Sequence, residues 1–364
     1  MSSLTDKEVH RYIEEIVKGV KGIQNRLEND VRAMCKILSL LLEDYKKRNG
    51  NEGDISQRLT GRFKDIYKSL ELHLKFHLGA AVVITELNTL GQKIGMTPEE
   101  RDALPGIECA IDPGSKILEI LSDMTEFFPD APNGSESHAN AVVTVAKELF
   151  SKLGTKNTFK PKVLTLVSHN GKWFVGSSVA VSHFLRPLCL YNRICDFKQS
   201  LKRAVIYYQP LETDDNAHWN SSSFWFKPMG YTAEKPPCQN CTFMFQNLSG
   251  FLSGTGHLAK EGVGETFLAA CGEYLPTNQC LPNDAGSDDE VVNVALTKFK
   301  DKCKLYYQSF HEIVSGCRLA YISNESEEDE SRKVENLKNA YQTYVKDRIH
   351  IFGLRPECNG SLRP

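Results

Sequence analysis

Apolar residues recur at spacings of three and four over long stretches of the first hundred residues, and this periodicity constrains the fold more than any other feature. One such stripe runs from Asp6 to about Arg48, and a second runs from about Ile55 to Ile94. These spacings place the apolar side chains on one face of an α-helix. The glycine-containing segment 49–53 separates the stripes, so we expect two long helices joined as an antiparallel hairpin.

Shorter helices are expected to follow. Thr97 and Glu100 have the spacing of a capping box, with a proline at the first helical position between them. Periodic apolar residues also predict helices at about 115–128 and 137–153. We therefore expect residues 1–154 to form a helical bundle domain.

The pattern changes after residue 155 to one typical of β-strands. Two apolar segments, 162–168 and 172–176, flank the turn sequence His169-Asn170-Gly171, and an Asn-Gly turn between such segments predicts a β-hairpin. Further strands are expected at 203–208 and 223–226, and further helices at 289–317 and 332–351. The fold class is therefore predicted to be α+β: an all-helical amino-terminal domain precedes a domain of residues 155–364, in which helices flank a small β-sheet.

Composition narrows the class of protein. The 364 residues are 41% hydrophobic and 25% charged, values typical of a soluble globular chain of two or three domains. A net charge of -2 argues against binding nucleic acid or anionic membrane through bulk charge. Neither a membrane span nor a secretory signal is evident. Eleven cysteines are an odd number without an export signal, so we expect free thiols in a reducing, cytoplasmic location.

Two compact motifs combine thiols with a carboxylate. The first is Pro237-Cys238-Gln239-Asn240-Cys241, and the second, thirty residues downstream of Cys241, is Cys271-Gly272-Glu273. A Cys-x-x-Cys pair in the first turn of a helix brings two sulfurs to one metal ion, and thiolates select zinc over hard cations. A third cysteine ligand leaves the fourth position for water, with Glu273 beside it as a proton carrier.

These motifs resemble the signature of the zinc-dependent nucleoside and nucleic-acid deaminases, which combine Cys-x-Glu or His-x-Glu with Pro-Cys-x-x-Cys. The resemblance implies a hydrolase in which Cys238, Cys241 and Cys271 bind zinc and Glu273 is the general acid and base. It covers at most about residues 160–285. In that family the glutamate motif comes first along the chain, whereas here it comes second, so either the order is circularly permuted or the resemblance is accidental.

Other interpretations of the same residues remain open. His138-Ala139-Asn140, upstream, has a histidine but lacks the glutamate, so a site built on it would keep metal without a proton carrier. Cys280 offers a fourth sulfur, which would close a structural zinc site. Cys271 can also be an ordinary buried thiol and Glu273 an exposed carboxylate. The alternative function is a non-enzymatic interaction or regulatory scaffold, for example in innate immunity, with structural cysteines or zinc.

The segment 156–203 is strongly basic and contains a single acid, Asp196. Its nine basic residues are Lys156, Lys160, Lys162, Lys172, Arg186, Arg193, Lys198, Lys202 and Arg203. Because aromatic residues are interleaved with the basic ones, the segment could bind a nucleotide or a single-stranded nucleic acid. Alternatively, the aromatic residues belong to the core of a small sheet and the basic residues form its solvated surface. The amino-terminal helices offer apolar stripes for a protein partner or for self-association. The substrate-binding residues and the substrate are not specified by any motif.

Overall fold

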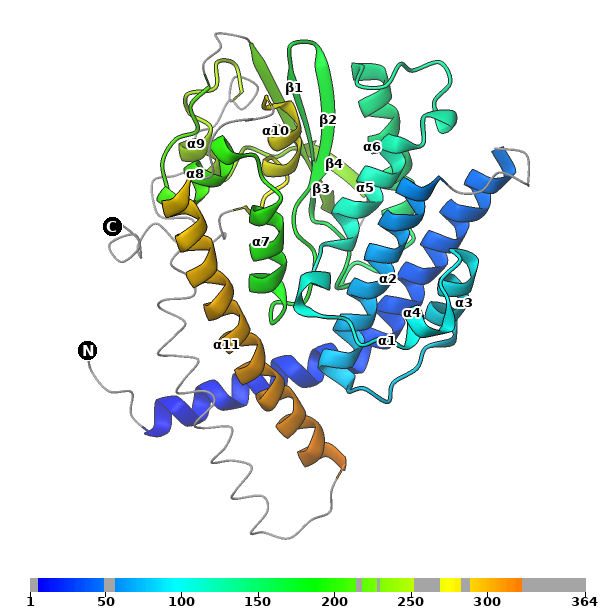
Figure 1. The fold of residues 1–364 in the computed structure, drawn as a ribbon, viewed down its shortest axis with the longest axis vertical. Helices are drawn as coiled ribbons and strands as arrows, with labels where there is room; N and C mark the ends of the chain where they lie inside the picture. Colours follow the sequence, from blue (N-terminus) through cyan, green and yellow to red (C-terminus); the bar gives the residue numbers. More distant parts are fainter. Residues whose placement is uncertain are drawn as a thin grey trace.

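The computed structural model describes residues 6–48, 56–213, 218–227, 230–251, 269–282 and 289–322 (Figure 1). Within these ranges a helical region precedes a small antiparallel sheet, as the α+β prediction requires. The predicted helix at 332–351 and most of the glycine-rich connection between the cysteine motifs lie outside the described residues.

The helical region begins with the predicted long helix. Its elements are α1 (Asp6–Arg48), α2 (Gln57–Leu78), α3 (Thr85–Lys93), α4 (Pro98–Asp102), α5 (Pro113–Asp123) and α6 (Glu136–Ser151), with short 3-10 turns at Ile107–Cys109 and Thr125–Phe127. The capping box that starts α4 is formed, because Thr97 Oγ1 accepts from the Glu100 backbone N–H at 3.2 Å and Glu100 Oε2 accepts from the Thr97 N–H at 2.9 Å.

The second apolar stripe forms two helices, so the prediction of one helix from 55 to 94 was wrong. Gly79 ends α2 with φ of 91°, a conformation that favours glycine, and its N–H bonds to the carbonyl of Lys75. Ile84 then precedes α3 in an extended conformation. The exposed Val83, at 71% relative accessibility, lies in this break, which the apolar periodicity alone conceals.

The sheet contains β1 (Val163–His169), β2 (Lys172–Ser177), β3 (Trp219–Lys227) and β4 (Gly230–Glu234) in the order β2-β1-β3-β4, with every neighbouring pair antiparallel. The predicted hairpin is confirmed. Asn170 and Gly171 have φ of 51° and 71°, as a tight hairpin turn with two left-handed residues requires. The predicted strand at 223–226 lies within β3.

Residues 203–208 form a helix end, so the prediction of a strand there was wrong. After α7 (Arg186–Cys195), α8 spans Gln199–Tyr207. The buried side chains of Leu201, Ala204 and Val205 follow the helical spacing, and Tyr208 ends α8 in the left-handed conformation, with φ of 48°. The β-branched and aromatic residues that suggested a strand therefore pack as one helix face.

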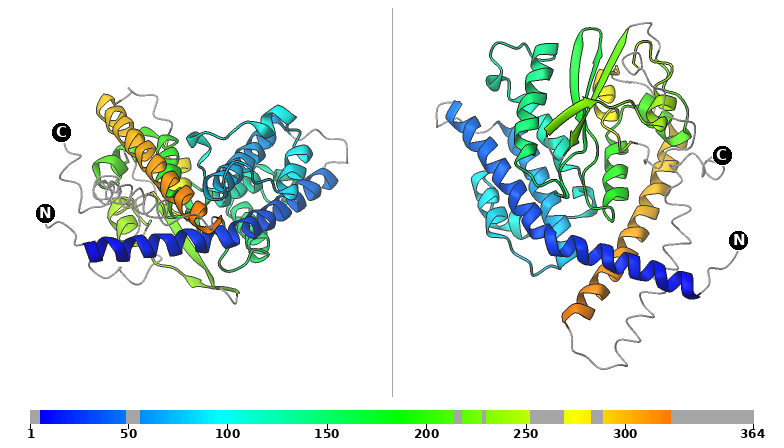
Figure 2. Two further views of the ribbon diagram at one scale, coloured as in Figure 1. Left: turned by 90° about the horizontal axis from the view of Figure 1, so that it is seen from below. Right: turned by 180° about the vertical axis from the view of Figure 1, so that it is seen from behind.

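Helices cover the β1–β2 hairpin on both sides. Helices α5 and α6 contact β2, and α10 (Tyr274–Cys280) contacts both β1 and β2. The two groups lie on opposite sides of the hairpin in Figure 1 and in the right-hand view of Figure 2. Helix α11 (Glu290–Ile322) packs on α7 and crosses α1 (Figure 2). One apolar core runs from α1 and α2 through α5 and α6 to β1, and a second surrounds α8, α9 (Gln239–Met244) and α10.

Across the described ranges, none of the helices combines the length and the apolar character that a membrane span requires. The nine cysteines whose side chains are described are free thiols.

Candidate metal centre

The two cysteine motifs lie at the starts of two short helices. Cys238 is the N-cap of α9 and Cys241 lies in the first turn of that helix, which begins two residues after Pro237. In the second motif, Cys271 and Glu273 immediately precede α10, with Glu273 at its N-cap. Cys241, Cys271 and Glu273 are buried, and Cys238 is half-buried.

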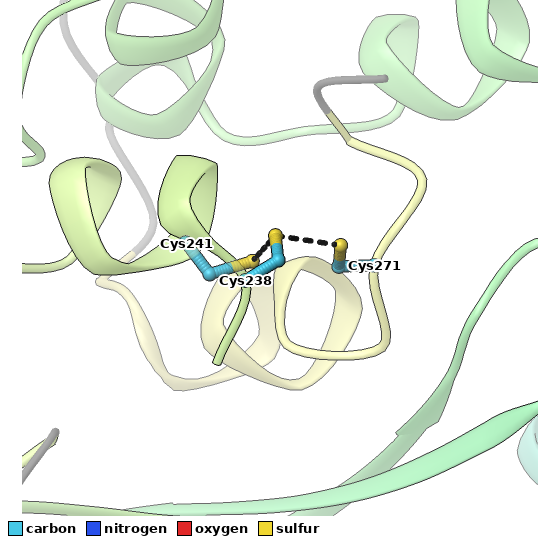
Figure 3. A group of neighbouring side chains, drawn as sticks. All are labelled: Cys238, Cys241 and Cys271. Carbon is cyan, nitrogen blue, oxygen red and sulfur yellow. Dashed lines mark hydrogen bonds between the residues drawn. The ribbon is translucent and has the colours of Figure 1, made fainter. Parts of the chain in front are cut away.

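The three sulfur atoms point toward one another (Figure 3). Cys238 Sγ lies 3.5 Å from Cys241 Sγ and 3.3 Å from Cys271 Sγ, and all three sulfurs lie within 4.8 Å of one another. Tetrahedral coordination with zinc–sulfur bonds of about 2.3 Å separates two sulfurs by about 3.8 Å. The two distances from Cys238 Sγ are therefore within a few tenths of an ångström of this value, a difference on the order of thermal motion. The cluster is a group that can hold a metal ion.

Neither alternative ligand joins the cluster. Cys280 lies at the opposite end of α10, and burial raises its thiol pKa to about 12. His138 is buried on α6, where its ring packs edge-on against Phe128 and desolvation lowers its pKa. Among the described side chains, the sulfurs that meet are those of Cys238, Cys241 and Cys271. Within the described residues, the group that could hold a metal therefore has three members rather than the four of a closed structural site.

The three thiols of the cluster differ in the direction of their pKa shifts. Hydrogen bonding with the Cys241 and Cys271 thiols lowers the pKa of Cys238 well below its usual range. Burial raises the pKa of Cys241, and hydrogen bonding to Cys238 raises that of Cys271. One negative charge is therefore stabilised by two neighbouring thiols, and the other two protons must leave when all three sulfurs bind a metal.

A chain of hydroxyl groups holds the Glu273 carboxyl against the cluster. Ser223 Oγ donates to Glu273 Oε1 at 3.1 Å, and Thr165 Oγ1 lies 2.8 Å from Ser223 Oγ. The other carboxyl oxygen, Oε2, lies 3.6 Å from Cys241 Sγ. Burial, and next the charge of Cys238, raise the pKa of Glu273. A raised pKa suits a group that must both take up and release a proton near neutrality.

Two glycines allow the second motif to lie directly on the sheet. A Cβ added to Gly272 would lie 2.5 Å from Thr165 Oγ1. A Cβ added to Gly176 on β2 would lie 2.4 Å from Pro276 Cδ and 2.5 Å from the Gly272 carbonyl oxygen. All three distances are below van der Waals contact, so the position of Cys271 and Glu273 depends on Gly176 and Gly272 having no side chain.

Substitution G176A is therefore expected to destabilise the protein by about 1–3 kcal/mol, because the added methyl group must displace α10 from β2. Gly61, exposed on α2 with open space around its Cα, offers a control, since G61A should be neutral or stabilising by up to about 1 kcal/mol. Urea unfolding followed by circular dichroism measures both effects. A G176A protein with the midpoint of the unmodified chain would contradict this account of the packing.

A buried arginine anchors the loop that carries Cys271. Arg193, on α7, donates through Nη2 to the carbonyls of Ser177 and Cys271, at 3.2 Å and 3.3 Å. It is 7% exposed, so this member of the basic segment cannot serve as part of a solvent-facing patch. The N–H of Val179 also donates to the Ala270 carbonyl at 2.9 Å. These bonds fix the backbone on both sides of the third thiol.

Sequence reasoning missed Thr165, Ser223 and Arg193. The first two face each other in the β1–β3 register, and their small hydroxyl side chains replace the apolar residues expected at buried strand positions. A buried hydroxyl in a strand needs a hydrogen-bond partner, and this was the signal available from the sequence. Arg193 gave no such signal, because an arginine in a basic segment is usually exposed.

Comparisons with protein-family models, with curated proteins and with solved structures found no match to this chain.

Proposed function

We propose that this protein is a zinc-dependent deaminase that acts on the base of a nucleoside, nucleotide or nucleic acid. The observation that carries the proposal is the meeting of three cysteine sulfurs with a buried carboxyl group, whose Oε2 lies 3.6 Å from Cys241 Sγ. Three protein ligands leave a fourth tetrahedral position for water, which is the pattern of a catalytic zinc site. When bound, zinc supplies Lewis-acid activation of water for attack on the base.

The residues of the chain have distinct roles in this proposal. Cys238, Cys241 and Cys271 hold the metal. Glu273 carries protons on Oε2, the oxygen that faces the cluster, while the hydrogen bond from Ser223 fixes Oε1 and thus the orientation of the carboxyl group. Thr165 is a positioning residue that acts through Ser223.

The reversed order of the motifs does not prevent their residues from meeting. Cys238 and Cys271 are 33 positions apart along the chain, and their sulfurs lie 3.3 Å apart. The starts of α9 and α10 face each other, and α10 rests on β1 and β2. This proximity favours the circularly permuted interpretation of the resemblance over the accidental one.

The test is a metal analysis combined with an assay of ammonia release. The purified protein is expected to contain one zinc ion per chain and to deaminate a cytosine or adenine compound among nucleosides, nucleotides and single-stranded oligonucleotides. A chelator should remove both zinc and activity, and added zinc should restore them. Protein without zinc would overturn the proposal. Zinc without ammonia release from any of these compounds would instead identify the scaffold with a structural metal.

A further inference from the structure

We propose that a basic cavity between α1 and the two segments 155–162 and 179–186 binds a compact ligand that carries several phosphate groups, such as a triphosphate. The cavity has a volume of about 410 Å³. It is distinct from the cysteine cluster, since none of the three cysteines lines it. Its volume falls in the range of about 300–1,000 Å³ that is usual for small-molecule sites.

The charged side chains that line the cavity are all basic. Its five basic side chains are Arg26, Lys156, Lys160, Lys162 and Arg186, and no aspartate or glutamate is among its lining residues. The nearby carboxyl of Asp30 lies 3.9 Å from Arg26 Nε, but it accepts hydrogen bonds from the N–H and Oγ1 of Thr158, at 2.9 Å and 2.7 Å. Asp30 therefore offsets part of the charge of one arginine, and the lining residues themselves include no carboxylate.

Burial is the main influence on the titration of two lining residues, and positive charge adds to it at His183. Desolvation, and next the charges of Arg186 and Arg26, lower the pKa of His183 to about 4, so its imidazole is neutral near pH 7. Desolvation lowers the pKa of Lys160. A neutral imidazole can donate a hydrogen bond to an anion without adding further repulsion among the cations.

The number of cations indicates the class of ligand. A terminal phosphate group carries a charge of about -1.5 to -2 near neutrality, so a single phosphate would balance fewer than half of the five basic groups. A triphosphate, with about four negative charges, matches them more closely. Arginine forks and lysine ammonium groups are the side chains that bind phosphate oxygens in proteins.

A backbone hydrogen bond connects the wall of the cavity to the loop that carries Cys271. Val179 lines the cavity, and its N–H donates to the carbonyl of Ala270, the residue before Cys271. The N–H of Ala180, also in the lining, donates to buried Asp112 at 3.3 Å. Hydrogen bonds to residues outside the cavity therefore fix the backbone of this part of the cavity wall. The proposal itself does not require the metal centre to be catalytic.

Isothermal titration of the full chain with inorganic triphosphate, ATP and AMP tests the proposal. We expect saturable binding of triphosphate and ATP, at least tenfold tighter than that of AMP, and weaker binding at higher salt. ATP binding more tightly than triphosphate would assign the site to a nucleotide, and equal affinities would assign it to the polyphosphate group itself. A single-stranded oligonucleotide that binds more tightly than triphosphate and competes with it would overturn the small-molecule assignment.

The double variant K156E/K162E should weaken triphosphate binding at least tenfold, because both lysines are exposed in the lining. The matched control is K47E/K172E, which makes the same change in net charge at exposed positions outside the cavity and should bind as the unmodified chain does. Equal weakening in both variants, or no saturable binding of triphosphate by the unmodified chain, would overturn the site. Circular dichroism checks folding, and K156Q/K162Q replaces the first variant if it is unfolded.

Discussion

Substitution E273Q is expected to lower the rate of deamination by about 10²–10⁴-fold while leaving one zinc ion bound per chain. Glutamine has nearly the shape of glutamate and can still accept the hydrogen bond from Ser223, so the buried site should keep its packing. It cannot carry a proton between water and the base. The measurement is ammonia release under single-turnover conditions, together with the zinc content of the same sample.

The control for this variant is E212Q, which changes an exposed carboxylate and should retain full activity. A second informative variant is S223A, which removes the hydroxyl that orients Oε1 and should reduce the rate less than E273Q does. An E273Q protein with more than about a tenth of the original rate, far from the loss expected of a lost acid and base, would rule out the proposed role of Glu273.

Substitution C271A is expected to abolish tight zinc binding and to lower the thermal stability of the zinc-loaded protein. A ligand that binds only the folded chain stabilises it by about 4 kcal/mol when its free concentration is about 1,000 times the dissociation constant. Removal of one of three protein ligands forfeits most of this free energy, because the remaining pair cannot complete the coordination. Zinc titration and thermal unfolding with and without zinc measure the two effects.

Cys280 supplies the matched control, because it is the last residue of α10, the helix that Cys271 precedes, and lies outside the cluster. C280A should bind zinc as the unmodified chain does. With a chelator present, the difference in midpoint between C271A and the unmodified chain should shrink, since zinc then stabilises neither. Loss of zinc from C280A and retention by C271A would show that the metal is held by a different set of thiols.

Features set by neighbouring residues could be predicted from the sequence. The long helix α1, the capping box at Thr97 and the Asn170-Gly171 hairpin each depend on side chains a few positions apart. The pairing of Cys238 with Cys241 is local in the same sense, because a helix N-terminus fixes their separation. Local rules therefore determined these elements.

Features that depend on residues far apart in the sequence could not be predicted as well. The meeting of Cys271 with Cys238 depends on how α10 docks on the sheet, and the motif spacing only suggested it. The segment 203–208 has strand-forming residues, yet burial of Leu201 and Val205 against the second core makes it helical. The pairing of Thr165 with Ser223 required the β1–β3 register, which no short pattern specifies.

The position of α5 and α6 on β2 has a consequence for how this chain can be divided. The hairpin that supports Gly272 and carries Thr165 is covered on one side by helices from the amino-terminal region, and β1 shares an apolar core with α1 and α2. A fragment beginning at residue 155 would expose that apolar surface to water. The part of the chain that carries the three clustered thiols is thus shielded from water by the part that carries none of these three.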